Sequence, residues 1–264
     1  MADDPKPHHF NKSLDRGLHV LDLFTRNVPS LSAKEIADKL NIGATTLYPF
    51  LHTLASHGYL EVDAQKRYRL GLKLLERVGE LNQVYDVRSV ARRELVTLSR
   101  KISANARLAV LYGSEVLYLE QEEGGPAANI ILREVVGLRV PCYCTALGKV
   151  LLAYLPPQDV ETIIDSLDFA PFTDNTITSP ERLQEELVAV RERGYSTEIE
   201  ELQLGGACVG APIRNSTGRV IAAISASFLA SRADDKELER IIDRILEAAA
   251  DISAQLGFKG DNSL

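Results

Sequence analysis

The chain lacks the segments that would place it in or across a membrane. No run of eighteen apolar residues occurs in its 264 positions, which excludes a spanning helix. The N-terminal residues MADDPKPHHFNK have no apolar core of the kind that a secretory signal peptide needs. Cysteine is scarce, and Cys142, Cys144 and Cys208 form an odd set whose spacing fits no disulfide framework. A reducing, cytoplasmic environment is therefore predicted.

Histidine and net positive charge are missing from most of the chain. All five histidines lie before residue 60, so the later part lacks the commonest metal ligand, and the Cys-x-Cys at 142–144 alone is a weak metal spacing. We expect neither a metal nor a cofactor. The net charge is −7, yet residues 1–85 carry 11 Lys and Arg against 10 Asp and Glu, whereas the remainder carries 19 against 27. Binding of a nucleic acid by the first part would then depend on local clusters of cations.

Apolar residues, by contrast, are abundant enough for globular cores, at 45% of the chain, and the length is typical of two domains. The pattern along the chain contains neither an internal repeat nor a low-complexity tract. The predicted organisation is a disordered tail over residues 1–12, a first domain over 13–70, a linker helix over 71–88, a second domain over 89–257 and a C-terminal tail over 258–264.

Residues 32–70 have the order of a helix, a second helix and a hairpin. Ser32 lies three residues before Glu35, which predicts a capping box that opens the first of these helices. Gly58 predicts the end of the second helix, because glycine readily adopts the left-handed conformation found there. An earlier helix over residues 13–26 is expected to complete a three-helix core. The apolar positions assigned to the helix faces are Leu14, Leu18, Leu21, Ile36, Leu40, Leu47, Leu51 and Leu54.

The hairpin has a basic turn. Residues 59–62 and 67–70 alternate like two strands, and residues 63–66 connect them. A helix pair followed by a basic hairpin is the outline of a winged helix-turn-helix, which presents its second helix to a DNA groove and its wing to the phosphates. The alternative is a helical hairpin and a strand hairpin whose charges are merely solvated. The residues expected to contact DNA are Thr45, Thr46, Tyr48 and His52 on the helix and Lys66, Arg67 and Arg69 at the wing.

The second part alternates between helical and strand periods. Strands clustered between helices predict an α+β class, with one antiparallel sheet and helices on its faces. The Pro156-Pro157 pair is expected to stop one of these helices. The predicted helices cover residues 89–101, 145–155, 180–193 and 234–256, and the predicted strands cover 107–112, 115–121, 129–133, 138–140, 196–200, 208–214 and 219–228.

From Lys12 to Gly257 the chain resembles the IclR family of bacterial transcriptional regulators. The motifs that carry the resemblance are SLxRGL at 13–18, GYL at 58–60, YRLG at 68–71, PxxCTALGK at 141–149, GY at 194–195, ExxxG at 201–205, CVxAP at 208–212 and AAISxS at 222–227. The resemblance implies a GAF-like second domain that binds a small effector, and homodimers or homotetramers on double-stranded operator DNA. It also adds Ser13 and Arg16 to the expected DNA contacts. The effector positions that it implies are Ala146, Leu147, Glu198, Cys208, Ser225 and Ser227.

The chemistry of these positions suits a small acid. Ser225 and Ser227 alternate along a strand, so both hydroxyls face the same side. Ala146 and Leu147 lie near a helix start, where backbone amides can hold a carboxylate. Glu198 would repel an anion unless it is protonated or paired. The simpler alternatives are that the two serines are buried hydroxyls bonded to backbone and that the cysteines are small core residues.

The chain departs from the family pattern at two places. Pro49 lies within the expected recognition helix, where the family commonly has Arg, and Cys142-Tyr143 replaces an apolar-histidine pair. Gly148-Lys149 does not fit the phosphate-binding loop motif GxxxxGK(S/T). Tyr143 occupies the position of the first glycine, and Val150 occupies the position of the Ser or Thr after the lysine.

The leading hypothesis is a transcriptional regulator that responds to a small organic molecule, either a carboxylate or an aromatic catabolite. One alternative is a sensor whose DNA reader is weakened by Pro49. The other is an enzyme with Cys208 as nucleophile and Glu198 as base, although no histidine is available nearby.

Overall fold

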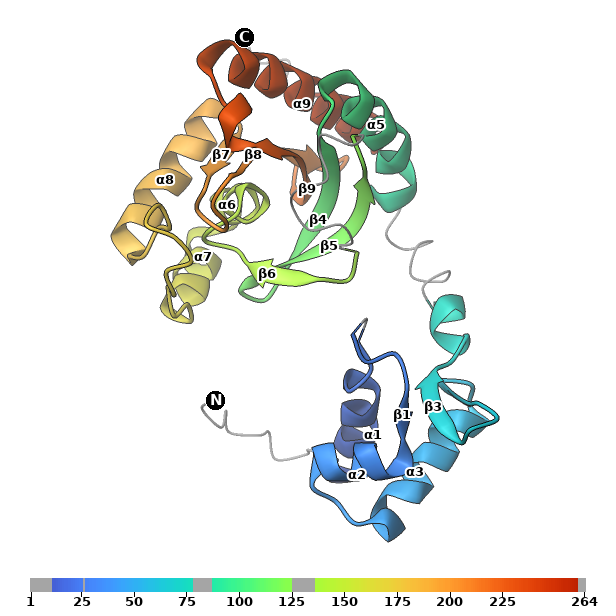
Figure 1. Ribbon diagram of the computed structural model, residues 1–264. Coiled ribbons are helices and arrows are strands. Elements are labelled where there is room, and N and C mark those ends of the chain that lie inside the picture. Colours follow the sequence, from blue (N-terminus) through green and yellow to red (C-terminus); the bar gives the residue numbers. More distant parts are fainter. Residues whose placement is uncertain (1–10, 26, 78–86, 125–135, 261–264) are drawn as a thin grey trace. The chain divides into compact units, whose positions relative to one another are not determined.

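The computed structural model describes residues 11–25, 27–77, 87–124 and 136–260 (Figure 1). These residues divide into two compact units, an N-terminal unit that ends before residue 78 and a C-terminal unit that begins at Val87. Each has a hydrophobic core of its own. No helix of the described part is both long and apolar enough to span a bilayer.

The N-terminal unit has the winged helix-turn-helix arrangement that the sequence predicts. Its helices are α1 (Lys12–Asp22), α2 (Ala33–Leu40) and α3 (Ala44–Ser56), and its strands are β1 (Leu31–Ser32), β2 (Leu60–Val62) and β3 (Arg67–Leu70). The strands form an antiparallel sheet in the order β1-β3-β2, so β1 is an addition to the predicted hairpin.

The capping signals in the sequence of this unit form the helix ends that they predict. The predicted capping box is present, since the Ser32 backbone N–H donates to Glu35 Oε2 at 2.7 Å and the Glu35 N–H donates to Ser32 Oγ at 3.3 Å. Gly58 follows the end of α3 with a φ of +77°, the left-handed conformation. These two signals fix where α2 begins and where α3 ends.

The prediction for the first helix was partly wrong. The helix ends at Asp22, four residues earlier than expected, and Leu14 and Leu18 are 62% and 52% exposed. Apolar residues occur on two sides of this helix, and the side that packs carries Val20 and, partly buried, Leu21. The core of the unit consists of Val20, Phe24, Leu31, Ile36, Leu47, Leu51 and Leu60.

Pro49 lies inside α3 and not in its first turn. The helix begins at Ala44, so Pro49 is its sixth residue. Proline has no N–H, and the carbonyl of Thr45, four residues earlier, therefore loses its donor within the helix. Helix α3 forms nevertheless, because Leu47 and Leu51 are fully buried against the other two helices.

The C-terminal unit is built on one antiparallel sheet in the order β6-β5-β4-β9-β8-β7. Its helices are α5 (Val87–Ile102), α6 (Ala146–Ala153), α7 (Pro157–Asp165), α8 (Pro180–Arg193) and α9 (Asp235–Gln255), with a 3-10 turn η2 (Ala230–Arg232). Its strands are β4 (Asn105–Tyr112), β5 (Glu115–Glu122), β6 (Arg139–Pro141), β7 (Ser196–Ile199), β8 (Gly206–Arg214) and β9 (Val220–Leu229). The predicted α+β class is confirmed.

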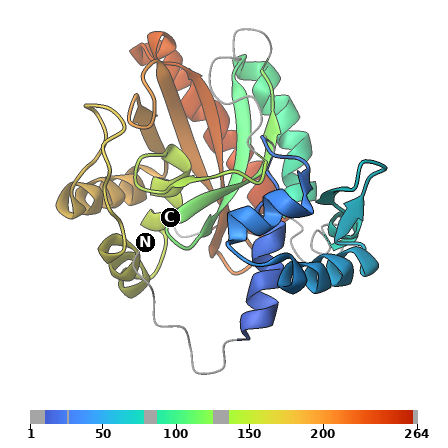
Figure 2. The same cartoon turned by 60° about the horizontal axis from the view of Figure 1, so that its bottom comes forward.

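The two faces of this sheet are covered by different helices. Figures 1 and 2 show α5 and α9 beside each other along one face. Alternate residues of β9, such as Ile224 and Ala226, pack under these two helices. The opposite face is covered by α6, with α7 and α8 outside it, and receives Ala223 and Tyr118. Ser225 and Ser227 lie on this second face, because side chains alternate along a strand.

The other sequence predictions for this unit have mixed outcomes. The predicted strand at 129–133 and residues 78–86, half of the predicted linker helix, lie outside the described residues, whereas residues 73–77 are helical. Helix α7 was missed, because the proline pair that ends α6 also opens a new helix with Pro157 at its first position. The other predicted helices and strands of the unit are present with shifts of a few residues.

Candidate functional site

A cavity lies in the C-terminal unit between the start of α6 and the sheet face that α6 covers. The volume open to a water-sized molecule is about 20 Å³, and it lies within about 440 Å³ of space that is free of protein atoms and partly open to solvent. Strands β4, β5, β7, β8 and β9 all contribute to its wall. The six positions that the sequence assigned to an effector all line it: Ala146, Leu147, Glu198, Cys208, Ser225 and Ser227.

Strand register explains why these positions meet. Glu198 lies opposite Cys208 in the β7–β8 pair, and Cys208 lies opposite Ser227 in the β8–β9 pair. Directly opposed residues on antiparallel strands face the same side of the sheet. Ser225 shares that side with Ser227, because it is two residues earlier on the same strand. The four side chains therefore point into one cavity although their chain positions span thirty residues.

Arg107 is a charged cavity residue that sequence reasoning missed. It is 2% exposed and lies opposite Ser225 in the β4–β9 pair. Its Nη1 donates to Ser227 Oγ at 3.0 Å, and its Nε donates to Gln121 Oε1 at 2.9 Å. Its guanidinium also lies 5.7 Å from the centre of the Tyr118 ring. A single arginine within an apolar strand was the only sign of it in the sequence. Its place in the cavity depends on the register of β4 with β9, which the sequence does not show.

The start of α6 forms the opposite wall. Thr145 caps the helix, because its Oγ1 accepts the Gly148 N–H at 3.1 Å. Ala146 and Leu147 are the first two residues of the helix and line the cavity. The first amides of a helix have no carbonyl one turn before them, and together with the helix dipole they favour an anion. This wall is therefore suited to a carboxylate.

Glu198 is buried but hydrogen bonded. Its Oε1 accepts the backbone N–H groups of Glu201 at 2.7 Å and Leu202 at 3.3 Å. Burial raises the pKa of Glu198, whereas these two hydrogen bonds lower it, and burial is the larger effect. The carboxylate thus holds the turn between β7 and β8 in place on one side and faces the cavity on the other.

The cysteines show no features of nucleophiles. Burial raises the pKa of Cys142 and of Cys144 to about 12 in each case, and burial also raises the pKa of Cys208. A thiol with a raised pKa stays protonated, and the thiolate is the reactive form. Cys208 instead lies 3.1 Å from Ser227 Oγ. Among the described residues no group of three His, Cys, Asp or Glu side chains is arranged to hold a metal ion.

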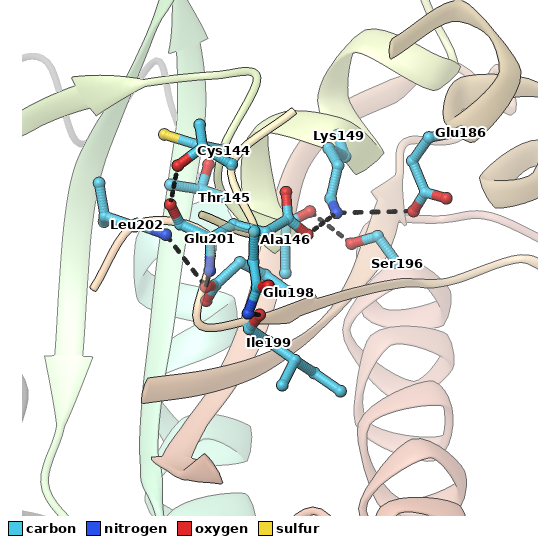
Figure 3. Close-up of polar contacts among 12 residues, drawn as sticks. Cys144, Thr145, Ala146, Lys149, Glu186, Ser196, Glu198, Ile199, Glu201 and Leu202 are labelled. Atoms are coloured by element: carbon cyan, nitrogen blue, oxygen red, sulfur yellow. Dashed lines mark hydrogen bonds and ion pairs between the residues drawn. The ribbon is translucent and has the colours of Figure 1, made fainter. Parts of the chain in front are cut away.

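A buried charge cluster lies beside the cavity (Figure 3). Lys149, on α6, has a side chain that is 2% exposed, and its Nζ lies 2.5 Å from Glu201 Oε1 and 3.6 Å from Glu186 Oε1. Glu186 is also held by Arg193, whose Nη2 lies 2.7 Å away. Because the Glu201 N–H donates to Glu198, this cluster connects α6 and α8 with the turn that Glu198 holds.

In the N-terminal unit, the positions predicted to contact DNA are accessible on α3. Thr45, Thr46, Tyr48 and His52 are all exposed, on the side away from Leu47 and Leu51. Ser13 and Arg16 are exposed on α1, and Arg16 borders a shallow depression that also includes Asn41, from the turn before α3. This geometry is compatible with one continuous surface for a nucleic acid.

At the wing, two of the three predicted cations already have partners within the protein. Arg67 donates from Nη2 to the Ser30 carbonyl at 2.9 Å and lies 3.3 Å from Glu35. Arg69 donates to Glu61 Oε2 from Nε at 3.0 Å and from Nη2 at 2.8 Å. Lys66 is exposed at the tip, with a φ of +59°, and makes no ion pair with any described residue. Lys66 is therefore the most accessible of the three cations.

Both units match models of known protein families. Residues 13–64 match the family model of the IclR helix-turn-helix domain, and residues 80–254 match that of the bacterial transcriptional regulator IclR C-terminal region. The regulator XynR of Escherichia coli is 36% identical over 94% of this chain and 98% of its own.

Two solved structures show the same fold. The IclR structure of Thermotoga maritima has a TM-score of 0.76 at 31% identity, over 93% of this chain and 99% of its own. An IclR homolog from Microbacterium hydrocarbonoxydans, complexed with 4-hydroxybenzoate, has a TM-score of 0.84 at 27% identity, over 93% and 99% of the two chains. The relatives are named as regulators, which decides against the enzyme alternative. The chain belongs to the IclR family of bacterial transcriptional regulators, and it is a DNA-binding regulator and not an enzyme.

Proposed function

We propose that the protein binds operator DNA in the cytoplasm as a homodimer or homotetramer and is controlled by a small organic effector, a carboxylate or an aromatic catabolite. The observation that carries this proposal is the cavity lined by Ser225, Ser227 and the first residues of α6. The homolog complexed with 4-hydroxybenzoate supports an effector that is both aromatic and a carboxylate.

The proposed control follows from linkage between two binding events. A dimer places two recognition helices in successive major grooves, and the spacing of these helices sets operator affinity. An effector changes that affinity only to the extent that it binds one conformation of the protein better than the other. The turn held by Glu198 and the charge cluster at Lys149 are the contacts next to the cavity that could respond to an effector.

The proposal is tested by fluorescence anisotropy with a labelled fragment of the intergenic DNA upstream of the gene. Unrelated DNA of equal length is the control, and both fragments are titrated over a range of salt. We expect tight, salt-sensitive binding of the upstream fragment and weaker binding of the control. The same complex then serves to screen small organic acids for release of the DNA.

A weakened DNA reader is the second candidate function, and the interior position of Pro49 favours it. In that case both fragments would bind weakly and equally, with and without effectors, while small acids would still raise the melting temperature of the C-terminal unit. Retained effector binding with no operator selectivity would replace the leading proposal by this one.

The wing gives a separate prediction. Lys66→Ala should weaken binding to all DNA sequences and reduce the slope of log K against log salt by about one, because one phosphate contact is lost.

Arg67→Ala should weaken DNA binding in the same way and should also lower the melting temperature of the N-terminal unit, since Arg67 connects the wing with Ser30 and Glu35. The measurement is a salt titration of each variant, with thermal melts alongside. An unchanged slope for either variant would remove that residue from the DNA contacts.

A further inference from the structure

Helix α3, the expected recognition helix, has neither an acidic, a lysine or arginine, nor an amide side chain. None of its thirteen residues, all of which the structure describes, is Arg, Lys, Asp, Glu, Asn or Gln. Exposed cations of the unit lie on other elements, among them Arg16 on α1, Lys39 on α2 and Lys66 at the wing. The groups suited to phosphates are therefore separate from the helix that would face the bases.

This composition excludes most of the specific contacts that side chains make with bases. Arg or Lys reads guanine with two hydrogen bonds, Asn or Gln reads adenine in the same way, and Asp or Glu accepts from cytosine. Ser and Thr hydroxyls both donate and accept, so they distinguish the bases poorly. The specific contact that remains for small side chains is the apolar one with the C5-methyl group of thymine.

The outer side of α3 carries the groups that such a contact needs. Thr45 and Pro49 are four residues apart, so they lie on the same side of the helix, one turn from each other. Both are exposed, and their side is turned away from the buried Leu47 and Leu51. Thr45 offers its Cγ2 methyl group, and Pro49 offers the methylene groups of its ring. Both lie in the N-terminal half of α3, the part that contacts base edges in helix-turn-helix proteins.

The ring of Pro49 is well suited to this role. Proline loses almost no side-chain conformational entropy when it is buried, so its ring packs on a methyl group at little entropic cost. Thr45 and Pro49 are about 6 Å apart along the helix axis, since each residue rises by about 1.5 Å. Successive base pairs are about 3.4 Å apart. The two side chains therefore match methyl groups on thymines one or two base pairs apart.

We propose that α3 reads its operator half-site through thymine methyl groups, with Thr45 and Pro49 each packed against the C5-methyl of one thymine in the major groove. This inference rests on the proposed function, because it names what the same helix recognises in the DNA. It assigns the reading of bases to apolar contacts and the binding of phosphates to the cations of other elements.

The test uses the full-length protein and duplexes that differ by single methyl groups. The preferred site is first selected from random-sequence DNA, and each of its thymines is then replaced by deoxyuridine, which lacks only the C5-methyl. Affinity is measured by fluorescence anisotropy. We expect a loss of about fourfold at each contacted thymine, the effect of one buried carbon group. Deoxyuridine outside the half-sites should change nothing, and the salt slope should stay the same, because no phosphate contact is altered.

Two further base analogues give the converse measurement. At a contacted position, 5-methylcytosine should bind about fourfold more tightly than cytosine, because it restores only the methyl group. Replacement of guanine by 7-deazaguanine, which lacks the N7 acceptor, should weaken binding less than deoxyuridine does. A larger effect of 7-deazaguanine than of any deoxyuridine would overturn the proposal, since the helix would then read guanine, with His52 as the available donor.

Variants at the two positions assign the methyl groups to side chains. Thr45→Ser removes only a methyl group, so it should bind the thymine site about fourfold more weakly and the deoxyuridine site as the wild-type protein does. Thr45→Val keeps a methyl group and should still prefer thymine to deoxyuridine. Pro49→Ser should lose this preference at the second thymine. Thr162→Ser, at an exposed position of α7, is the matched control and should keep both preferences.

The outcomes separate this inference from the proposed function. Selective binding of a site in which no deoxyuridine weakens affinity would overturn the methyl readout and leave the protein a DNA-binding regulator. A preference for thymine in Thr45→Ser and Pro49→Ser equal to that of the wild-type protein would overturn the assignment to these two side chains. Failure of the folded protein to select any site would count against the proposed function, and so against this inference as well.

Discussion

Replacement of Lys149 by methionine should lower the free energy of unfolding of the C-terminal unit by about 3–5 kcal/mol. The Lys149 side chain is 2% exposed, and its ammonium is 2.5 Å from Glu201 Oε1. Removal of the ammonium leaves the Glu201 carboxylate buried without its counter-ion. The other carboxylate oxygen, Oε2, already has no hydrogen-bond partner among the described residues. Burial of a carboxylate without a partner costs free energy, and this cost is the reason for the expected loss of stability.

The loss should depend on pH. Burial raises the pKa of Glu201, and Lys149 opposes that rise. In the Lys149→Met variant the folded-state pKa of Glu201 should therefore rise further above its unfolded value. A carboxyl group with a raised folded-state pKa favours the folded state when it is protonated, and this contribution is lost as the pH rises through the folded pKa. The difference between variant and wild type should accordingly shrink as the pH is lowered.

Urea unfolding at several pH values checks this result. Lys149→Met combined with Glu201→Gln should recover much of the stability, because the buried charge is then removed as well. Lys236→Met, at an exposed position of α9, is the control and should change stability little. A loss that is the same at every pH and persists in the double variant would mean that Lys149 acts by packing and not by charge.

The sequence predicted those parts of the site whose signals are local or belong to long motifs. Five of the six cavity positions lie in motifs of the C-terminal unit, Glu198 lies between two such motifs, and the alternation of Ser225 and Ser227 is visible in the strand itself. Arg107 was missed because its role depends on the pairing of β4 with β9, which a single sequence does not show. Lys149 was missed for a similar reason, since Glu201 lies fifty-two residues away in the chain.

The errors in the N-terminal unit have a different cause. Helix α1 has apolar residues on two sides, and the packed side is decided by the contacts of α1 with α2 and α3. The sequence period alone therefore could not choose between Leu14 and Val20. Likewise, the wing cations could be counted from the sequence, but the use of Arg67 and Arg69 in bonds within the protein depends on the folded hairpin.

Replacement of Gly148, next to Lys149, by alanine should strongly destabilise the C-terminal unit. An ideal Cβ on Gly148 would lie 2.1 Å from the Cys142 carbonyl oxygen and 2.4 Å from the Cys142 Cα. Both are backbone atoms, so α6 would have to move away from the segment before it. Gly148→Ala should therefore lower the free energy of unfolding by about 1–3 kcal/mol or more, as for other overpacked cores. The glycine of this pair serves close packing, and no phosphate loop is needed to explain it.

Replacement of Gly17 by alanine should instead raise the free energy of unfolding of the N-terminal unit. Gly17 lies inside α1, where an added Cβ would meet no atom within 4 Å, and alanine is favoured over glycine in a helix by about 1 kcal/mol. Denaturant unfolding of the two variants compares them directly. Gly148→Ala should also weaken effector binding, because Ala146 and Leu147 precede it and line the cavity, whereas Gly17→Ala should leave it unchanged. A stable Gly148→Ala variant with normal effector affinity would show that α6 can shift without disturbing the cavity, and the close approach to Cys142 would then have no part in shaping the site.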